Sequence, residues 1–288
     1  RGEPFLAPSQ TFQVGAAGDY CSLANPSPFS ANPANANGAN ALALCQALME
    51  KSAPGTAATF YANPQFSQAV GPTFAFPSVR GNPNLETETA KTWTIGAVLN
   101  SPFEGLARDL RVSLDYYSIE VNDAIGPQSV DVAQRQGFVP GFNPTFDVNN
   151  PFCLGINRVA NDGAVGNVLL TYLNNGRFET DGVDVAIDWA FDLGPGRFSV
   201  NSFISYLISL KSTELPNDPL VEFAGTLGPT QNELNAGAYD WKMLNTFGYN
   251  LGKWCAALQW QYLPSIDWIT AATNPATRIA GAASYNLF

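Results

Sequence analysis

The chain has 288 residues, a formal net charge of −10 and no histidine. Nucleic-acid phosphates require clusters of lysine and arginine, so this acidic composition argues against a nucleic-acid-binding protein. Charged residues make up 13% of the chain, whereas soluble domains average about 25%. A polar, weakly charged composition with 12% aromatic residues fits an outer-membrane β-barrel or a secreted all-β protein.

No transmembrane helix is predicted, because no apolar run reaches the 18 residues that such a helix needs. That does not exclude a membrane barrel, whose strands each carry only about ten alternating residues. The opening sequence RGEPFLAPSQ lacks Met, so we expect a piece of a larger protein or a mature product.

Residues 1–88 are predicted to form a long extracellular loop region with one short helix. From residue 13 onward this part is rich in Asn, Pro, Ala, Gly and Ser, which is typical of loops. Residues 39–51 interrupt it with the apolar side chains Leu42, Leu44, Leu48 and Met49, a pattern that indicates a short helix packed within the loop.

The four cysteines predict one disulfide and no metal site. Cys21 and Cys45 flank a short Asn/Pro/Ala-rich stretch, which makes them the candidate disulfide. The chain has no CxxC motif and no histidine, so zinc is not expected, and no other metal or cofactor is expected either. Cys153 has no obvious partner, and Cys255 lies within a predicted strand as a candidate free thiol.

Residues 89–288 are predicted to form transmembrane strands and their connections. In residues 182–193 (GVDVAIDWAFDL), the apolar residues alternate with a second phase in which three of five side chains are carboxylates. Strict period-two alternation indicates a strand with one apolar and one polar face. Residues 167–193 allow one long strand or two halves around residues 174–176. Similar alternation predicts strands at residues 92–99, 110–121, 197–210, 240–249, 254–262 and 282–288.

The predicted connections alternate between short and long. The tight turns GPG and NLGK follow Leu193 and Tyr249, whereas about 45, 30 and 18 residues follow Val121, Leu210 and Tyr262. This asymmetry is typical of outer-membrane barrels, with short periplasmic turns and long extracellular loops. Aromatic residues gather beside the tight turns, which favours an interfacial girdle over ordinary enrichment of aromatics in strands.

Several segments, in order, resemble the TonB-dependent outer-membrane receptor family. GNPNLETETAKTWT (residues 81–94) is similar to a GNPxLxPETAxxxE-type segment, although Glu86 and Thr87 depart from the usual residues. SPFEGLARDLRVSLDYYSIEVNDAI resembles the turn and strand that come next in the family. FETDGVDVAIDWAFDLGPGRFSV and KMLNTFGYNLGKWCAALQWQY resemble later hairpins, so that the resemblance covers residues 81–288.

The resemblance implies an all-β fold, an antiparallel transmembrane β-barrel that is partial here and forms part of a 22-stranded barrel. It also implies a plug domain, which we expect to be absent from this chain, and through it coupling to TonB and the inner-membrane energy complex. The implied location is the outer membrane of a Gram-negative cell, in contact with its lipid. Other membrane or surface proteins are further potential partners.

No catalytic constellation is found, and we predict that the protein is not an enzyme. Without histidine, no Ser-His-Asp or Cys-His arrangement exists. Two pairs of carboxylates, Asp184 with Asp188 and Glu179 with Asp181, lie on strand faces. They are out of phase, so both face the lumen only if a bulge or turn intervenes. A lumenal carboxylate row would bind cations or repel anions, but we favour the simpler interpretation that these carboxylates line a solvated polar lumen.

Two long connections mix acidic and large apolar residues, residues 218–222 (DPLVE) and residues 265–270 (SIDWIT). Loops on a rigid scaffold often carry binding sites, and Trp268 would either stack on a sugar or siderophore or pack within its own loop.

Two functions remain open at this level. The first is active transport of a scarce nutrient, such as a siderophore, cobalamin or oligosaccharide, by a TonB-dependent receptor. The alternative is a secreted or surface-exposed structural or adhesive β-protein without transport activity.

Overall fold

The computed structural model describes residues 13–15, 18–71, 73–127, 129–213, 215, 218–227, 238–273, 276 and 279–288. The chain divides into two compact units. Unit 1 combines residues 1–85 with 126–173, and unit 2 combines residues 86–125 with 174–288. Among the described residues, no helix has the length and apolar character needed to cross a membrane.

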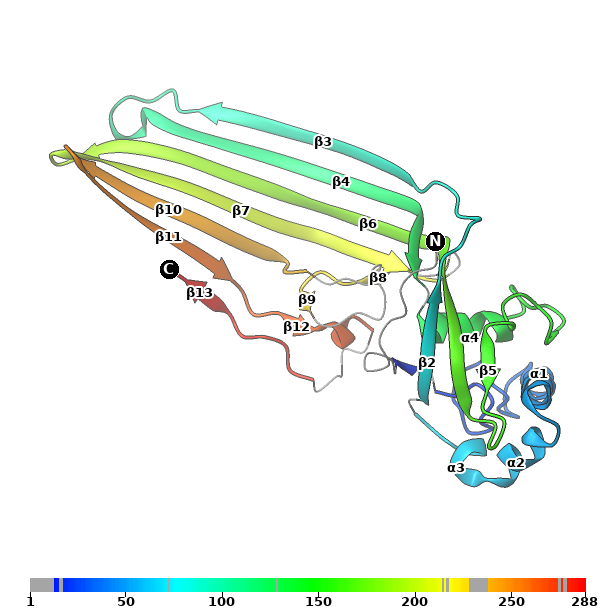
Figure 1. Cartoon of the computed structure of the whole chain (residues 1–288). Coiled ribbons are helices and arrows are strands. Elements are labelled where there is room, and N and C mark those ends of the chain that lie inside the picture. Colours follow the sequence, from blue (N-terminus) through cyan, green and yellow to red (C-terminus); the bar gives the residue numbers. More distant parts are fainter. Residues whose placement is uncertain are drawn as a thin grey trace. The chain divides into compact units, whose positions relative to one another are not determined.

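Unit 2 is built on a sheet of long strands that run side by side (Figure 1). Antiparallel pairing joins β3 to β4, β6 to β7, β7 to β10, β10 to β11 and β11 to β13, and β4 also pairs with β6. Among the described strands no pairing joins β3 to β13, so the sheet is open. The predicted fold class, an antiparallel and incomplete barrel, is confirmed. The bounds are β3 (Thr89–Asn100), β4 (Asp109–Pro127), β6 (Val165–Leu193), β7 (Gly196–Thr213), β10 (Trp241–Leu251), β11 (Trp254–Leu263) and β13 (Tyr285–Leu287).

Several strands are longer than the alternation predicts. β4 continues to Pro127, β7 continues to Thr213, and β6 is one strand of 29 residues that passes through residues 174–176 without a break. The pairing of β7 with β6, for example, continues through Lys211, Ser212 and Thr213, whose side chains are polar on both faces. Alternation therefore marks only the part of each strand that has one apolar face.

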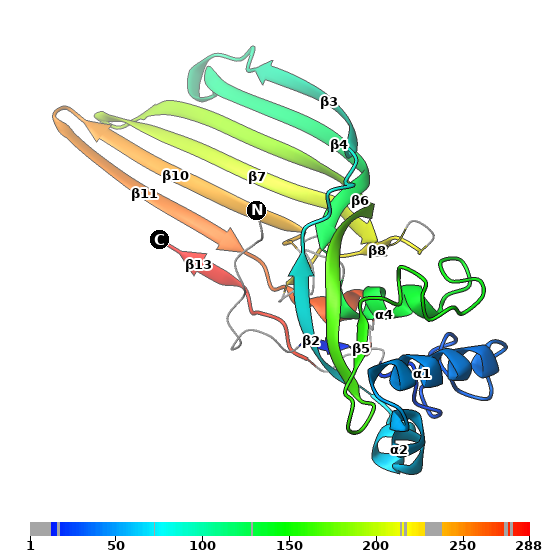
Figure 2. The same cartoon turned by 45° about the vertical axis from the view of Figure 1, so that its right-hand side comes forward.

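Tight turns join the strands at one end of the sheet. The β6–β7 and β10–β11 hairpins each leave two residues between their last paired positions, residues 194–195 and 252–253. Gly194 and Gly252 take φ values of +62° and +58°, which favour glycine and suit the twist of a two-residue hairpin. The connection between β3 and β4, which includes η2 (Gly105–Ala107), lies at the same end (Figures 1 and 2).

Short elements lie at the opposite end of the unit 2 sheet. β8 (Val221–Glu222) pairs with the end of β7, and β9 (Thr226–Leu227) pairs in parallel with β12 (Asp267–Trp268). The turn η3 (Ile269–Ala272) follows β12 directly. The long connections therefore carry some regular structure of their own.

Unit 1 combines helices with a small sheet. The helix predicted at residues 39–51 is present as α1 (Gly38–Ser52), whereas the other helices were not predicted. In the sheet β2 lies between β1 and the first part of β6, and β5 also pairs with β6. The remaining bounds are β1 (Gln13–Gly15), α2 (Thr56–Ala62), α3 (Pro64–Ser67), β2 (Thr73–Arg80), α4 (Val130–Phe138) and β5 (Ile156–Arg158).

Unit 1 has a conventional buried core. Leu44, Met49, Phe60 and Phe138 are all at most 1% exposed, and they pack in one cluster with the cysteines of the candidate disulfide. Cys21 and Cys45 are bonded to each other with their Cα atoms 5.5 Å apart. Closing this loop lowers the entropy of the unfolded chain and so stabilises a unit with a small core.

A buried ion pair joins the two sequence segments of unit 1. The guanidinium of Arg158 donates two hydrogen bonds to the carboxylate of Asp19, at 2.6 and 2.8 Å, and a third to the carbonyl of Gly163 at 3.2 Å. The backbone N–H of Cys21 donates to the same carboxylate at 2.8 Å. The Arg158 and Asp19 side chains are only 1% and 7% exposed, so each charge depends on the other for compensation.

We predict that Arg158→Met lowers the free energy of unfolding of unit 1 by about 3–5 kcal/mol, because it leaves the Asp19 carboxylate buried without a counter-charge. Pulse proteolysis across a urea series measures this loss. The double variant Asp19→Leu/Arg158→Met removes both charges and is expected to lose clearly less. Equal losses in the two variants would show that the charges do not depend on each other.

The two remaining cysteines differ in their surroundings. Cys153 is buried in unit 1, accepts a hydrogen bond from Asn143 Nδ2 at 3.4 Å, and lies beside Gly137. Burial raises the pKa of the Cys153 thiol to about 11, with the hydrogen bond from Asn143 opposing that shift. Cys255, in β11, is exposed.

Maleimide labelling at pH 7 is therefore expected to modify Cys255 and to spare Cys153, since the thiolate is the reactive form and a raised pKa keeps Cys153 protonated. After unfolding without reductant, mass spectrometry should detect two labels, and after reduction four. Four labels before reduction would contradict the disulfide.

Candidate functional site

The sheet of unit 2 has one apolar and one polar face. On β6, the side chains of Val183 and Val185 share a face with their cross-strand partners Tyr206 and Ile204. Ile187 lies on the same face, opposite Ser202. Large apolar side chains on this face remain accessible, including Trp93, Ile95 and Leu258, which are 50–65% exposed. A contiguous apolar surface of this kind normally meets a membrane or a partner. We call it the apolar face.

The opposite face, which we call the polar face, carries paired carboxylates held by neighbouring strands. Asp184 accepts a hydrogen bond from Ser205 Oγ, and Asp188 accepts one from Asn201 Nδ2, both at 2.6 Å. The predicted pair Asp184 and Asp188 therefore shares a face, as its spacing requires. Each carboxylate is oriented by a neutral donor, an arrangement that suits a hydrated polar lumen.

The second predicted carboxylate pair does not join the first. For both pairs to face the lumen, a bulge must lie between them. The register of β6 against β7 does shift between Asp181 and Gly182, so a bulge is present there. Its extra residue, Ile208, belongs to β7 and leaves the alternation of β6 unchanged. Glu179 and Asp181 consequently stay on the phase of Val183, the apolar face.

Aromatic side chains form a row across the apolar face beside the tight turns. The ring centroids of Trp189 and Phe191 are 4.5 Å apart, those of Phe191 and Phe198 are 5.5 Å apart, and those of Phe198 and Phe247 are 6.4 Å apart. This row joins β6, β7 and β10. It matches the girdle that the sequence predicts near the turns.

A second aromatic row crosses the apolar face nearer the opposite end of the sheet. Trp93 lies 5.3 Å from Tyr116 and Trp241 lies 5.0 Å from Tyr262, centroid to centroid, and Tyr206 lies opposite Trp241. Along β7, Phe198 and Tyr206 are separated by about eight residues, or roughly 26 Å at about 3.3 Å per residue. For a strand tilted by about 40°, this spacing corresponds to roughly 20 Å along the barrel axis, somewhat less than the apolar band of a membrane barrel, which is about 25 Å tall.

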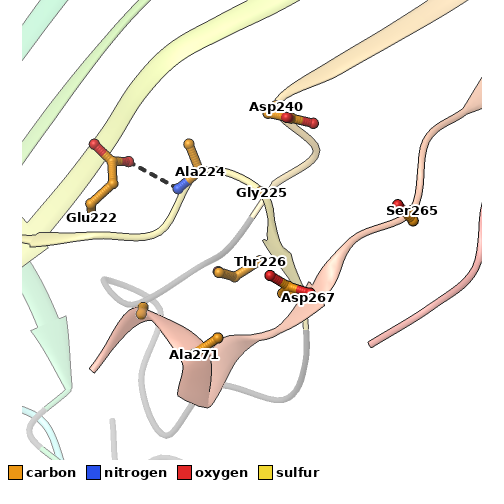
Figure 3. A pocket seen from close by; sticks show the side chains of 9 residues that line it. Glu222, Ala224, Gly225, Thr226, Asp240, Ser265, Asp267 and Ala271 are labelled. Carbon is orange, nitrogen blue, oxygen red and sulfur yellow. Dashed lines mark hydrogen bonds between the residues drawn. The ribbon is translucent and has the colours of Figure 1, made fainter. Parts of the chain in front are cut away.

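A polar pocket of about 440 Å³ lies among the long connections of unit 2 (Figure 3). It brings together the two connections singled out from the sequence, because Glu222 comes from the first and Ser265 and Asp267 come from the second. Asp240 and Thr226 also line it, and nothing in the sequence pointed to them. Trp268 pairs with Leu227 through β12 and β9 and is not among the lining residues.

Hydrogen bonds donated by backbone N–H groups fix the shape of this pocket. The N–H of Ala224 donates to Glu222 Oε1 at 2.9 Å, as drawn in Figure 3, and the N–H of Asp267 donates to the carbonyl of Gly225 at 3.0 Å. Gly225 has φ +73°, which favours glycine at the bend between β8 and β9. Carboxylates and hydroxyls dominate the lining, so the pocket suits a ligand that presents hydroxyl or cationic amine groups.

Over the described part of the chain, no group of three or more His, Cys, Asp or Glu side chains is placed to hold a metal ion. The expectation that the protein has no metal site and no enzymatic activity stays a prediction.

A family comparison accounts for the two faces of the sheet. The model of the family described as TonB dependent receptor-like, beta-barrel, matches residues 52–288. This chain belongs to that family. Membership in the TonB-dependent receptor-like barrels confirms the resemblance carried by residues 81–288 and extends it toward the N-terminus.

Comparisons with individual proteins add little to the family assignment. No curated protein matches the chain. Among solved structures, the siderophore receptor PirA from Acinetobacter baumannii is similar, with 14% identity, a TM-score of 0.40, and coverage of 75% of this chain and 26% of that one. The chain thus spans about a quarter of the length of that receptor, and a likeness of this degree says nothing about the ligand.

The two faces of this TonB-dependent receptor-like barrel can be tested with spin labels. In a Cys255→Ser background, a label at Ile204→Cys should be accessible to oxygen in the lipid. A label at the neighbouring Ser205→Cys should instead be accessible to a water-soluble nickel chelate. Electron paramagnetic resonance of the receptor in bilayers measures both accessibilities. The reverse pattern would contradict the assignment of the apolar face to lipid.

Proposed function

We propose that this chain is part of an outer-membrane receptor that imports a scarce nutrient into a Gram-negative cell by TonB-dependent active transport. The observation that carries the proposal is the apolar face, bounded by two aromatic rows, in a chain of the TonB-dependent receptor-like family. Strands that cross a bilayer need such a band on the outside, whereas the inside of a barrel tolerates carboxylates.

The chemistry of the pocket supports three candidate substrate classes. A siderophore, a cobalamin or an oligosaccharide presents hydroxyl or amide groups that could bind an acceptor-rich lining such as Glu222, Asp240 and Asp267. TonB and the inner-membrane energy complex would act through a plug domain. No step of this function requires covalent chemistry by the chain, which agrees with a receptor rather than an enzyme.

The alternative is a surface-exposed structural or adhesive protein without transport activity. It would require a soluble partner to cover the exposed apolar face. Among the described residues, nothing packs over Trp93, Ile95 and Leu258 to serve as that cover. Lipid accounts for the face without an additional component.

Uptake by a deletion strain of the source bacterium tests transport. Cells lacking the full-length receptor are expected to lose uptake of one radiolabelled substrate among ferric siderophores, cobalamin and oligosaccharides. Complementation should restore it only when TonB is present, because transport needs the energy complex.

Point variants test the pocket in the same assay. Asp240→Asn/Asp267→Asn is expected to weaken substrate binding several-fold, because two acceptors lose their charge, whereas Glu104→Gln, in the β3–β4 connection, is expected to leave binding unchanged. Unchanged uptake of every substrate by the deletion strain, together with altered surface adhesion, would favour the structural alternative.

A further inference from the structure

A separate cavity, of about 380 Å³, lies within unit 1. It is lined by the end of β2, by α4, by residues 151–156 and by residues 168–173 of β6. Aliphatic and aromatic side chains predominate in this lining, in contrast with the polar pocket of unit 2. Cavities of about 300–1,000 Å³ with mostly apolar walls are typical sites for small organic molecules. We call this one the apolar cavity.

The apolar cavity has a buried inner end and an open mouth. Ala133, Gln136 and Ile156 line it and are at most 6% exposed, so they lie at the inner end. Pro151 and Leu154 also line it but are exposed, so they lie at the mouth. A ligand would therefore bury one end among apolar side chains and keep the other end close to water.

One cation joins this lining. Arg80, the last residue of β2, is exposed and pairs in register with Thr171 of β6. Alternate residues of a strand share a face, so Arg80 lies on the face that Thr171 shares with Leu169 and Leu173, and all four residues line the apolar cavity.

The charge of Arg80 is available to a ligand. The described lining residues include no carboxylate. Arg80 also forms no ion pair within 4.0 Å with any residue that the structure describes. An exposed guanidinium beside an apolar cavity is complementary to a molecule that combines an apolar body with an anionic group.

We propose that the apolar cavity binds a small apolar molecule that carries one carboxylate, with the carboxylate paired to Arg80 and the apolar body at the inner end. A guanidinium donates two parallel hydrogen bonds to a planar carboxylate. One cation balances one negative charge, which suits a monocarboxylate better than a doubly charged phosphate. The lining shares no residue with the polar pocket, so the inference goes beyond the proposed function and does not depend on transport.

Incomplete packing is the competing explanation. A cavity of that origin stays dry and takes up apolar molecules such as benzene whether or not they carry a charge. The apolar cavity as a carboxylate site should instead prefer the charged ligand, and that preference should depend on Arg80.

The test titrates the purified full-length receptor with phenylpropionate, a water-soluble apolar acid, by isothermal titration calorimetry. The wild type is expected to bind it saturably. Arg80→Gln should bind about tenfold more weakly, because hydrogen bonds to a charged group are lost. Arg80→Lys keeps the charge and should bind more tightly than Arg80→Gln. Lys51→Gln removes an exposed cation that does not line the apolar cavity and should have no effect.

Phenylpropanol is the matched uncharged ligand and should bind the wild type and Arg80→Gln equally weakly. Absence of saturable phenylpropionate binding, or equal affinity of the wild type and Arg80→Gln for it, would overturn the inference. The polar-pocket variant Asp240→Asn/Asp267→Asn should bind phenylpropionate as the wild type does. A loss of binding in that variant would place the acid in the polar pocket and would also contradict the inference.

Discussion

Hydrocarbon offers no hydrogen-bond partner to a peptide group, so a strand that crosses it must pair along its whole length with neighbouring strands. The long registers of β6 with β7 and of β7 with β10 meet that requirement, and they leave only side-chain alternation to distinguish inside from outside. One phase must then be apolar, while the other is free to carry Asp184 and Asp188. The edge strands β3 and β13 carry unpaired backbone N–H and C=O groups, and within a membrane these groups must form hydrogen bonds with further strands.

Unit 1 is stabilised in a different way. In the part of unit 1 that the structure describes, the apolar core lies around Leu44, Phe60 and Phe138, and the buried charged side chains are Arg158 and Asp19, which pair with each other. A small core of this kind supplies limited stability, and the Cys21–Cys45 bond reduces the entropy that folding must overcome. The same chain therefore combines a unit whose apolar side chains are buried in its interior with one whose apolar side chains are exposed on one face of a sheet.

The sequence predicts those parts of the molecule that depend on local periodicity. Residues 182–193 alternate because β6 has one apolar and one polar face there, and the helix at residues 39–51 has a helical apolar pattern. The pairing of Asp19 with Arg158 could not be predicted, because it joins residues 139 positions apart and neither segment has a periodic signal. The residues of the polar pocket could be predicted only in part from the sequence. Both connections that line the pocket were recognisable by composition, whereas Asp240 and Thr226 reach it only through the folded path of the chain.

The discontinuity of unit 1 has a consequence for the order of assembly. Residues 86–125, which form the β3–β4 hairpin, are inserted between the two segments that unit 1 needs, residues 1–85 and 126–173. Once Asp19 and Arg158 have paired, the two ends of the hairpin are held together by unit 1. Part of the conformational entropy that is lost when the hairpin joins the sheet has then already been lost. Unit 1 cannot form until the hairpin has been synthesised, because residues 126–173 follow it in the chain. The folding of unit 1 would then hold the two ends of the hairpin close together and favour the pairing of both of its strands with the sheet in one step.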